Sequence, residues 1–162
     1  VTVQTRGKFL KGGKLIAALP TYARNNSYGE FVFDWSWAEA YERAGRNYYP
    51  KLVSASPFSP VTGPRLLYNE NSDGHEYAKK KLITAAHDLC STNGLSSWHT
   101  LFFEPSSLDF YKNQGLQLDL EFSITGKTII SKTSFAILPE ISPDLIDCTN
   151  SAKFLAEIGE LE

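Results

Sequence analysis

The sequence predicts an α+β fold, layered in the α/β manner, in which a mixed sheet is flanked by helices. Short alternating or apolar runs, among them TVQTRGKFL, LIAALPTYA and YYPKLVSASP, are typical of strands. One apolar stripe with a helical period predicts a helix from His75 to about Thr92. The expected order of elements is β-β-α-β-β-α-β-α. The 162 residues fit one domain, which can bury a core without a disulfide or a metal ion.

The first half of the chain contains a hairpin, a helix and a strand. Residues 1 to 23 form the predicted hairpin, because a Gly-Gly pair between the two runs tolerates the positive φ of a tight turn. Asp34 is the expected N-cap of a helix from Trp35 to Ala44, with its carboxylate accepting from the free backbone N–H groups of the first turn. A strand from Tyr48 to Pro57 follows.

The second half begins with a loop, because three prolines between residues 57 and 64 remove donors that a central strand needs. Strand pairing is expected to resume at Arg65 to Tyr68 and again at Ser97 to Phe103. Ser106 and Asp109 form a predicted capping box for a short helix over residues 108–113. On the long helix, the expected buried stripe is Ala78, Leu82, Ala85, Ala86 and Leu89. Lys79, Lys80 and Lys81 are expected in solvent, and His87 is expected either in solvent or in a contact at the rim of the core.

Charge and composition exclude several functional classes. A formal net charge of −2 argues against stable nucleic-acid binding, which usually needs a basic excess. No apolar run approaches the length of a membrane span, and the alternating, charged first residues do not resemble a signal peptide, so a cytoplasmic location is expected. Cys90 and Cys148 have no metal-ligand spacing and suit a reducing compartment. There is no P-loop, no nucleophile elbow and no zinc-protease motif.

Two places carry residue types suited to chemistry. His99 follows Trp98 on a strand expected to be central, where it is either a hydrogen-bonded core residue or a general base or substrate-orienting group. Arg65 follows Thr62 and Gly63, so a hydroxyl, a close backbone approach and a bidentate guanidinium come together for an anionic group. The alternative is a proline-shaped turn in which Arg65 pairs with a local acid.

Three segments, SYGEFVFDWSWAEAYERAG, YYPKLVSASPFSPVTGPRLL and GLSSWHTLFF, resemble the FemAB-like group of peptidoglycan biosynthesis/recognition proteins. The resemblance covers about residues 14 to 116. It implies a GNAT-type fold and a transferase that moves an acyl or aminoacyl group onto an amine, with acyl-CoA or aminoacyl-tRNA as the donor and a small molecule or peptide as the acceptor. The pyrophosphate loop R/Q-x-x-G-x-G/A of GNAT enzymes is absent, and VTGPR stands in its place, which argues against acetyl-CoA.

On this resemblance the chain is expected to be a fragment of an acyl or aminoacyl transferase, truncated at both ends, and the lack of any Met indicates the same. His99 is the expected catalytic base. The alternatives are a non-catalytic module that recognises a peptide or glycan through its aromatic side chains, and an inactive remnant. The expected substrate-binding residues are Tyr28, Asp34, Trp35, Lys51, Thr62 and Arg65.

The sequence changes character at residue 117. All eight Tyr, all three Trp and all five Arg precede it, which divides the chain into a partial GNAT-like domain (1–116) and an atypical tail (117–162). The expected tail elements are a hairpin around Gly126 and a helix from Ser151 to Leu161. The tail is interpreted as an out-of-frame translation, because one codon choice for residues 121–128 reads, in another frame, as the Gln-aromatic-His-Trp strand that the resemblance implies here. Such a tail should leave the sheet edge after Gly115 partly unpaired.

Overall fold

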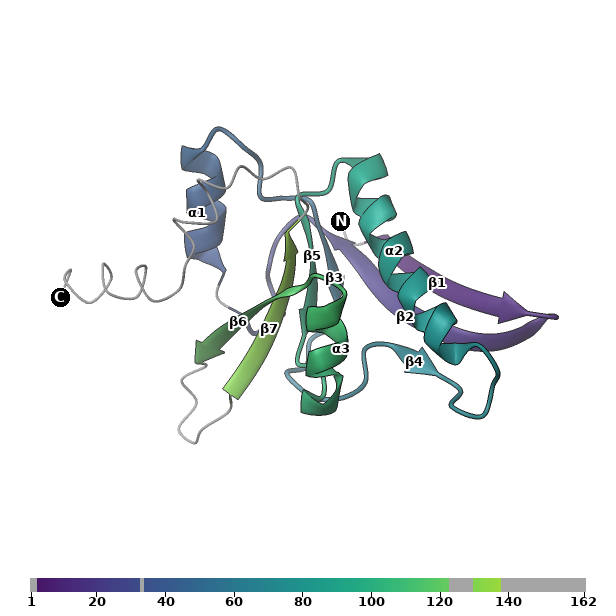
Figure 1. Ribbon diagram of the computed structural model, residues 1–162. Helices are drawn as coiled ribbons and strands as arrows, with labels where there is room; N and C mark the ends of the chain where they lie inside the picture. Colours follow the sequence, from purple (N-terminus) through teal and green to yellow (C-terminus); the bar gives the residue numbers. More distant parts are fainter. Residues whose placement is uncertain (1–2, 33, 123–129, 138–162) are drawn as a thin grey trace.

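The computed structural model describes residues 3–32, 34–122 and 130–137, and these residues form an α+β protein on one seven-stranded sheet (Figure 1). The strands are β1 (Val3–Lys11), β2 (Lys14–Arg24), β3 (Lys51–Ser54), β4 (Leu67–Tyr68), β5 (Ser97–Leu101), β6 (Gln117–Phe122) and β7 (Ile130–Ile137). Their order is β1-β2-β3-β5-β7-β6, and β4 pairs with β2 off this path. Only the pair β3–β5 is parallel among these described strands. The predicted α+β class with a mixed sheet is confirmed.

Three α-helices and one 3-10 helix accompany the sheet in the described part of the chain: α1 (Trp35–Arg43), α2 (His75–Asn93), η1 (Pro105–Ser107) and α3 (Leu108–Asn113). The main core lies where α2 packs on β2, β1 and β5. Ala78, Leu82 and Ala86 of α2 are buried as predicted, but Ala85 is exposed. The prediction for Ala85 is wrong because the buried face of α2 is rotated toward Ile83, which the predicted stripe omitted.

Two side chains at the edge of the buried face of α2, Lys79 and His87, contact aromatic rings. Lys79 is buried, with its Nζ 2.6 Å from a Glu76 oxygen and 4.4 Å from the centre of the Tyr68 ring. His87 is half-buried, with its ring centre 5.7 Å from that of Trp98. The expectation for Lys79 is wrong because a long amphipathic side chain at the edge of a buried face packs its stem inward, whereas the half-buried His87 takes the rim contact that was one of its two expected placements.

The two faces of β3 separate two parts of the protein. Successive side chains of a strand point to opposite faces, so Leu52 joins the core under α2, and Val53 joins a second cluster with Leu101. Lys51 shares the face of Val53, and His99 is the register partner of Val53 on β5. Figure 1 shows α1 standing apart from α2, across the central strands β3 and β5. Lys51 of β3, and Ser97 and His99 of β5, therefore lie on the face that α2 does not cover.

The segment after residue 116 extends the sheet. β7 pairs antiparallel with β5 and with β6, and β6 and β7 correspond to the predicted hairpin. The expectation of an unpaired sheet edge is wrong, because β7 supplies the missing pairing to β5 from Ser97 to Leu101. The turn at Gly126 and the predicted helix from Ser151 to Leu161 lie outside the described residues.

Two local predictions also need correction. The strand expected over residues 48–57 is shorter, since only Lys51–Ser54 pair as β3. The capping box at Ser106 and Asp109 is wrong, because α3 begins directly after η1 with Ser107 as its N-cap and without a side-chain capping bond. A 3-10 turn leading into the helix satisfies the first backbone groups without the box.

Candidate functional site

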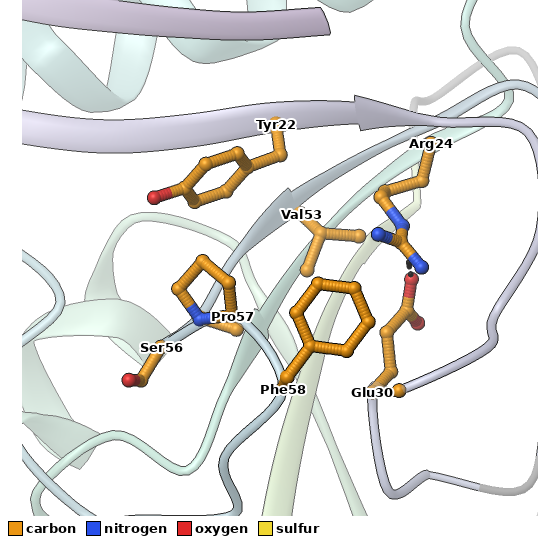
Figure 2. Close-up of a pocket in the computed structure, with 9 residues that line it drawn as sticks. Tyr22, Arg24, Glu30, Val53, Ser56, Pro57 and Phe58 are labelled. Carbon is orange, nitrogen blue, oxygen red and sulfur yellow. Dashed lines mark ion pairs between the residues drawn. The ribbon is translucent and has the colours of Figure 1, made fainter. Parts of the chain in front are cut away.

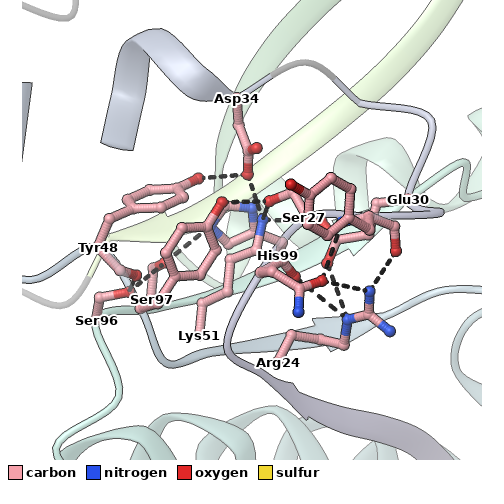
Figure 3. A network of polar contacts seen from close by, with 12 residues as sticks. Arg24, Ser27, Glu30, Asp34, Tyr48, Lys51, Ser96, Ser97 and His99 are labelled. Carbon is pink, nitrogen blue, oxygen red and sulfur yellow. Dashed lines mark hydrogen bonds and ion pairs between the residues drawn. The ribbon is translucent and has the colours of Figure 1, made fainter. Parts of the chain in front are cut away.

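Four charged side chains meet on the face of the sheet that α2 leaves open (Figure 3). Lys51, on β3, has no solvent exposure, and its Nζ lies 2.8 Å from Glu30 Oε2 and in a shorter contact with Asp34 Oδ2. Arg24, at the end of β2, places its Nε 3.4 Å from Glu30 Oε1. Two cations therefore offset two carboxylates, which is the condition under which charges persist in a protein interior. We call these four residues the ionic network.

Asp34 occupies the N-cap position of α1, as predicted, but its carboxylate does not cap the helix. The side chain is fully buried and accepts a hydrogen bond of 2.8 Å from the Tyr48 hydroxyl, in addition to its contact with Lys51. The capping prediction is wrong because a buried ammonium and a phenol within reach bind the carboxylate more strongly than exposed backbone donors would. Burial, together with the negative charge of Asp34, raises the pKa of Tyr48 far above its ordinary value, so Tyr48 stays a donor.

Glu30 is held by a turn that Arg24 fixes. The Glu30 N–H donates to the Ser27 carbonyl at 3.2 Å, and the Arg24 guanidinium donates to the Tyr28 carbonyl and, at 3.3 Å, to Asn26 Oδ1. Burial raises the pKa of the Glu30 carboxyl above its usual range, although the nearby charge of Lys51 opposes the rise. A carboxyl with a raised pKa beside a cavity is suited to accepting and returning a proton.

One cavity of about 420 Å³ lies on the outer side of this turn. Four of its nine lining residues are aromatic, and two of these, Tyr28 and Trp35, are 78% and 65% exposed. Phe31, also in the wall, has a φ of +58°, which is unusual for a bulky side chain and indicates a backbone held in place by its surroundings. We call this the aromatic cavity; it is lined by Asn26, Ser27, Tyr28, Gly29, Phe31, Val32, Trp35, Ala38 and Tyr49.

A second cavity, of about 290 Å³, lies at the carboxyl end of β3 (Figure 2). Figure 2 shows the Glu30 carboxylate facing the Arg24 guanidinium on one side, with the Phe58 ring between them and Pro57. Gly29 is required here, because a Cβ at this position would lie 2.4 Å from Phe58 Cδ1. We call this the Phe58 cavity; it is lined by Tyr22, Arg24, Gly29, Glu30, Val53, Ala55, Ser56, Pro57 and Phe58.

Two hydrogen bonds and one ion pair join the two cavities. The Tyr49 hydroxyl and Ser27 Oγ, both in the aromatic cavity, are 2.7 Å apart. Lys51 Nζ donates to Ser27 Oγ at 2.9 Å and lies 2.8 Å from Glu30, which lines the Phe58 cavity. The buried lysine thus contacts a residue from each of the two cavities, Ser27 and Glu30.

His99 lies beneath this arrangement and lines neither cavity. It is 1% exposed, its Nε2 is 2.7 Å from Ser97 Oγ, and its ring packs edge-on against Tyr48 at 5.9 Å between ring centres. Burial, reinforced by the charge of Lys51, holds the pKa of His99 well below its ordinary value, so the ring is neutral near pH 7. This geometry suits a residue that positions Tyr48 more than one that touches a substrate.

The Thr62–Arg65 loop does not reach either cavity. Arg65 is buried, and its guanidinium donates to the carbonyls of Leu101, at 2.7 Å, and Phe102, at 3.0 Å, with a further short bond to Val61. The expected partner was an anionic ligand or a local acid, and the observed partners are backbone carbonyls at the end of β5. Arg65 therefore fastens the proline-rich loop to the sheet, while Thr62 is exposed away from the cavities.

Of the residues predicted for a site, Tyr28 and Trp35 line the aromatic cavity, and Asp34, Lys51 and His99 form the layer behind it. The sequence analysis missed Glu30, although an acidic residue four positions before Asp34 in an otherwise apolar, aromatic run was a usable signal. Within the described ranges, no group of three or more His, Cys, Asp or Glu side chains could hold a metal ion.

Comparisons with known proteins give a family and two structures. The sequence pattern of the FemAB-like family, described as peptidoglycan biosynthesis/recognition, matches residues 6–127, which is more than half of the chain. No curated protein matches. Two structures of a CoA-dependent acyl-homoserine lactone synthase, BjaI, one with SAM and isopentyl-CoA and one with MTA, are 12% identical with a TM-score of 0.46; they cover 90% and 91% of this chain. The chain spans 62% of the length of that synthase.

Proposed function

The chain belongs to the FemAB-like family of peptidoglycan biosynthesis/recognition, and from this premise we propose that it transfers an acyl or aminoacyl group onto an amine. The observation that carries the proposal is the buried Lys51, which links a proton-accepting carboxylate in the Phe58 cavity to the hydroxyls of the aromatic cavity. Acyl transfer to an amine needs two bound substrates and a group that removes a proton from nitrogen. Two adjacent cavities joined by a titratable network meet both needs.

The side chains divide by role in this proposal. Tyr28 and Trp35 contact substrate from the rim of the aromatic cavity, where large rings with little conformational freedom favour binding. Asp34 and Lys51 hold the network in place, and His99 positions the Tyr48 hydroxyl that donates to Asp34. Arg65 fixes the loop, and Thr62 stays outside the site.

The donor in this proposal is an activated acyl or aminoacyl group, and acyl-CoA and aminoacyl-tRNA remain the two candidates. The net charge of −2 gives no standing basic face, so a tRNA donor would be held briefly. Among the described residues, no helix is long and apolar enough to cross a membrane. A cytoplasmic location, where both donors are made, is part of the proposal, as is a GNAT-like domain over residues 1–116.

Product formation tests the proposal. The full chain is incubated with peptidoglycan precursor peptides and with either acyl-CoA thioesters or aminoacyl-tRNA, and covalent addition to the amine is read by mass spectrometry. Trp35→Ala should lower the rate at least tenfold, because it removes a ring from the cavity wall. Tyr77→Ala, at another exposed aromatic position on α2, is the matched control and should leave the rate unchanged. Absence of product with every donor and acceptor contradicts a transferase.

A recognition module is the second candidate, favoured by the large exposed area of Tyr28 and Trp35 in one cavity. Exposed rings of this kind stack on sugar or peptide groups without any chemistry. The two candidates differ in one measurement. A module binds peptidoglycan fragments with an affinity that Trp35→Ala weakens and Lys51 substitutions spare, whereas a transferase loses turnover in both variants.

A further inference from the structure

We propose that the Phe58 cavity receives the acceptor amine and that Glu30 accepts the proton which this amine loses. This inference deepens the proposed transferase and rests on it. It assigns to Glu30 the role of general base that the sequence suggested for His99. The geometry is the reason, because Glu30 lines a cavity and His99 does not.

The walls of the Phe58 cavity define the ligand class. Its volume of about 290 Å³ is at the small end of the range for ligand sites, so it fits a short aliphatic amine or the end of a longer side chain. Tyr22, Val53 and Phe58 supply apolar and aromatic surface, which suits a methylene chain and the face-on approach of a cation. Glu30 also lines the cavity, and its two carboxylate oxygens are shielded from solvent by the packed wall, so an ammonium reaches them by displacing part of that wall.

The charges around Glu30 favour proton transfer from the ligand. Arg24 Nε and Lys51 Nζ lie 3.4 Å and 2.8 Å from the Glu30 oxygens, so an incoming ammonium is the third cation beside one carboxyl group. Crowding by like charges lowers the pKa of the ammonium, while burial raises the pKa of Glu30. Both effects move the proton in the same direction, from nitrogen to Glu30.

The structure also keeps Glu30 in place for this task. The Phe58 ring packs against the backbone of Gly29, the residue before Glu30, so closely that no Cβ fits between them. Phe58 itself has a φ of +54°, and Gly29 has a φ of +77°. Backbone conformations of this kind concentrate where a site must be held in one geometry. The cavity wall and the base are thus parts of one packed unit.

In the proposed reaction, proton transfer to Glu30 precedes acyl transfer. The ammonium gives one proton to the Glu30 carboxylate and becomes a neutral amine. The amine nitrogen attacks the carbonyl carbon of the donor, the new C–N bond forms, and the C–S bond of a thioester or the C–O bond of an ester breaks. The second proton leaves nitrogen for the thiolate or alkoxide leaving group, and Glu30 later returns its own proton to solvent.

Amine binding tests the inference without any need for turnover. The full chain is titrated with n-butylamine and, separately, with n-butanol, which has a similar shape and no charge, and the backbone amide signals of Gly29 and Glu30 are followed by NMR. We expect saturable shifts with the amine, affinity at least tenfold weaker for the alcohol, and weakening as acid protonates Glu30. Glu30→Gln should weaken amine binding at least tenfold, and the exposed Glu39→Gln control on α1 should not.

A second variant provides an independent test of the amine site if Glu30→Gln does not fold. Ala55→Leu fills the Phe58 cavity without altering a charge, so it should abolish amine binding while the ionic network remains. Equal affinity for amine and alcohol, or unchanged amine binding in both variants, overturns the inference.

Turnover separates this inference from the proposed function. With an acyl-CoA donor and n-butylamine as acceptor, the rate of thiol release should fall at least a hundredfold in Glu30→Gln, and the rate should no longer rise with pH. Glu30→Asp, which keeps a carboxylate, should recover part of the rate. Transfer that keeps its rate and pH profile in Glu30→Gln refutes Glu30 as the base and leaves the transferase intact. Specific amine binding without transfer from any donor refutes the transferase and leaves the amine site intact.

Discussion

Replacement of Lys51 by methionine is the most direct perturbation of the ionic network. The methionine side chain has a similar volume and no charge, so it leaves the packing of β3 in place. It leaves Glu30 and Asp34 buried together without the ammonium that contacts both of them. The variant therefore separates the electrostatic role of Lys51 from its volume.

The expected loss of stability is large because none of the three groups is near solvent. The Lys51 and Asp34 side chains have no exposure and that of Glu30 has 5%. Removal of one partner from a buried ion pair costs roughly 3–5 kcal/mol, since the remaining charge is desolvated and uncompensated. Stability of folded domains is on the order of 5–15 kcal/mol, so Lys51→Met should remain folded with a small margin.

The loss should depend on pH in a defined direction. Burial already raises the pKa of Glu30 in the folded protein, and loss of the Lys51 charge removes the main opposing effect. When the pKa of a carboxyl is higher in the folded state than in the unfolded state, ionisation favours unfolding. The free energy of unfolding is therefore unaffected below the unfolded pKa of about 4.3 and is reduced as pH rises through the folded pKa. The difference in free energy of unfolding between the wild type and Lys51→Met should therefore be smallest near pH 4.5 and largest near pH 8.

Urea unfolding followed by tryptophan fluorescence at pH 4.5, 6 and 8 measures this deficit. Lys80→Met, at an exposed position on α2, is the matched control and should change the free energy of unfolding by less than about 0.5 kcal/mol at every pH. A deficit of Lys51→Met below about 1 kcal/mol, or one that does not grow with pH, refutes the idea that Lys51 neutralises buried carboxylates.

Three further outcomes are expected. Gly29→Ala should lower the free energy of unfolding by about 1–2 kcal/mol because of the φ of +77° at this position, and by a further amount because the new Cβ clashes with Phe58. In urea unfolding, adding Phe58→Ala should relieve the clash and leave the loss that comes from φ. Arg65→Lys should cost about 2 kcal/mol through lost carbonyl bonds while amine binding in NMR stays unchanged, contrary to a ligand-binding Arg65. Resequencing the gene tests the reading-frame proposal for residues 117–162, and a TCN codon for Ser123 contradicts it.

The sequence predicted the elements of the main core well, because their apolar periods are local and strong. The long helix was expected over residues 75–92 and spans His75–Asn93, and the strands near 14–22, 48–56 and 97–103 join one sheet as predicted. Burial at the edge of the helix was less predictable. The orientation of α2 depends on its neighbours, so Lys79 packs against Tyr68, a contact that no local pattern of charges indicates.

The compositional break at residue 117 is less decisive in the structure than in the sequence. β6 begins at Gln117 and β7 pairs with β5 over five residues, so β-propensity after the break is sufficient for the sheet to continue. The family pattern also extends to residue 127. Strand pairing uses backbone groups that every non-proline residue carries. It therefore does not distinguish a strand that evolved as part of the domain from a segment produced by out-of-frame translation.

The site was harder to predict than the fold because it depends on contacts between distant residues. Lys51 in the strand YYPKLVSASP and Asp34 before a helix were both singled out, but Asp34 was expected to cap α1, and only the folded chain brings it to Lys51. Glu30 belongs to a turn whose position depends on Arg24 and on the Phe58 ring. An acid in a short aromatic run is a weak signal by itself, and it becomes a candidate base only when the cavity beside it is known.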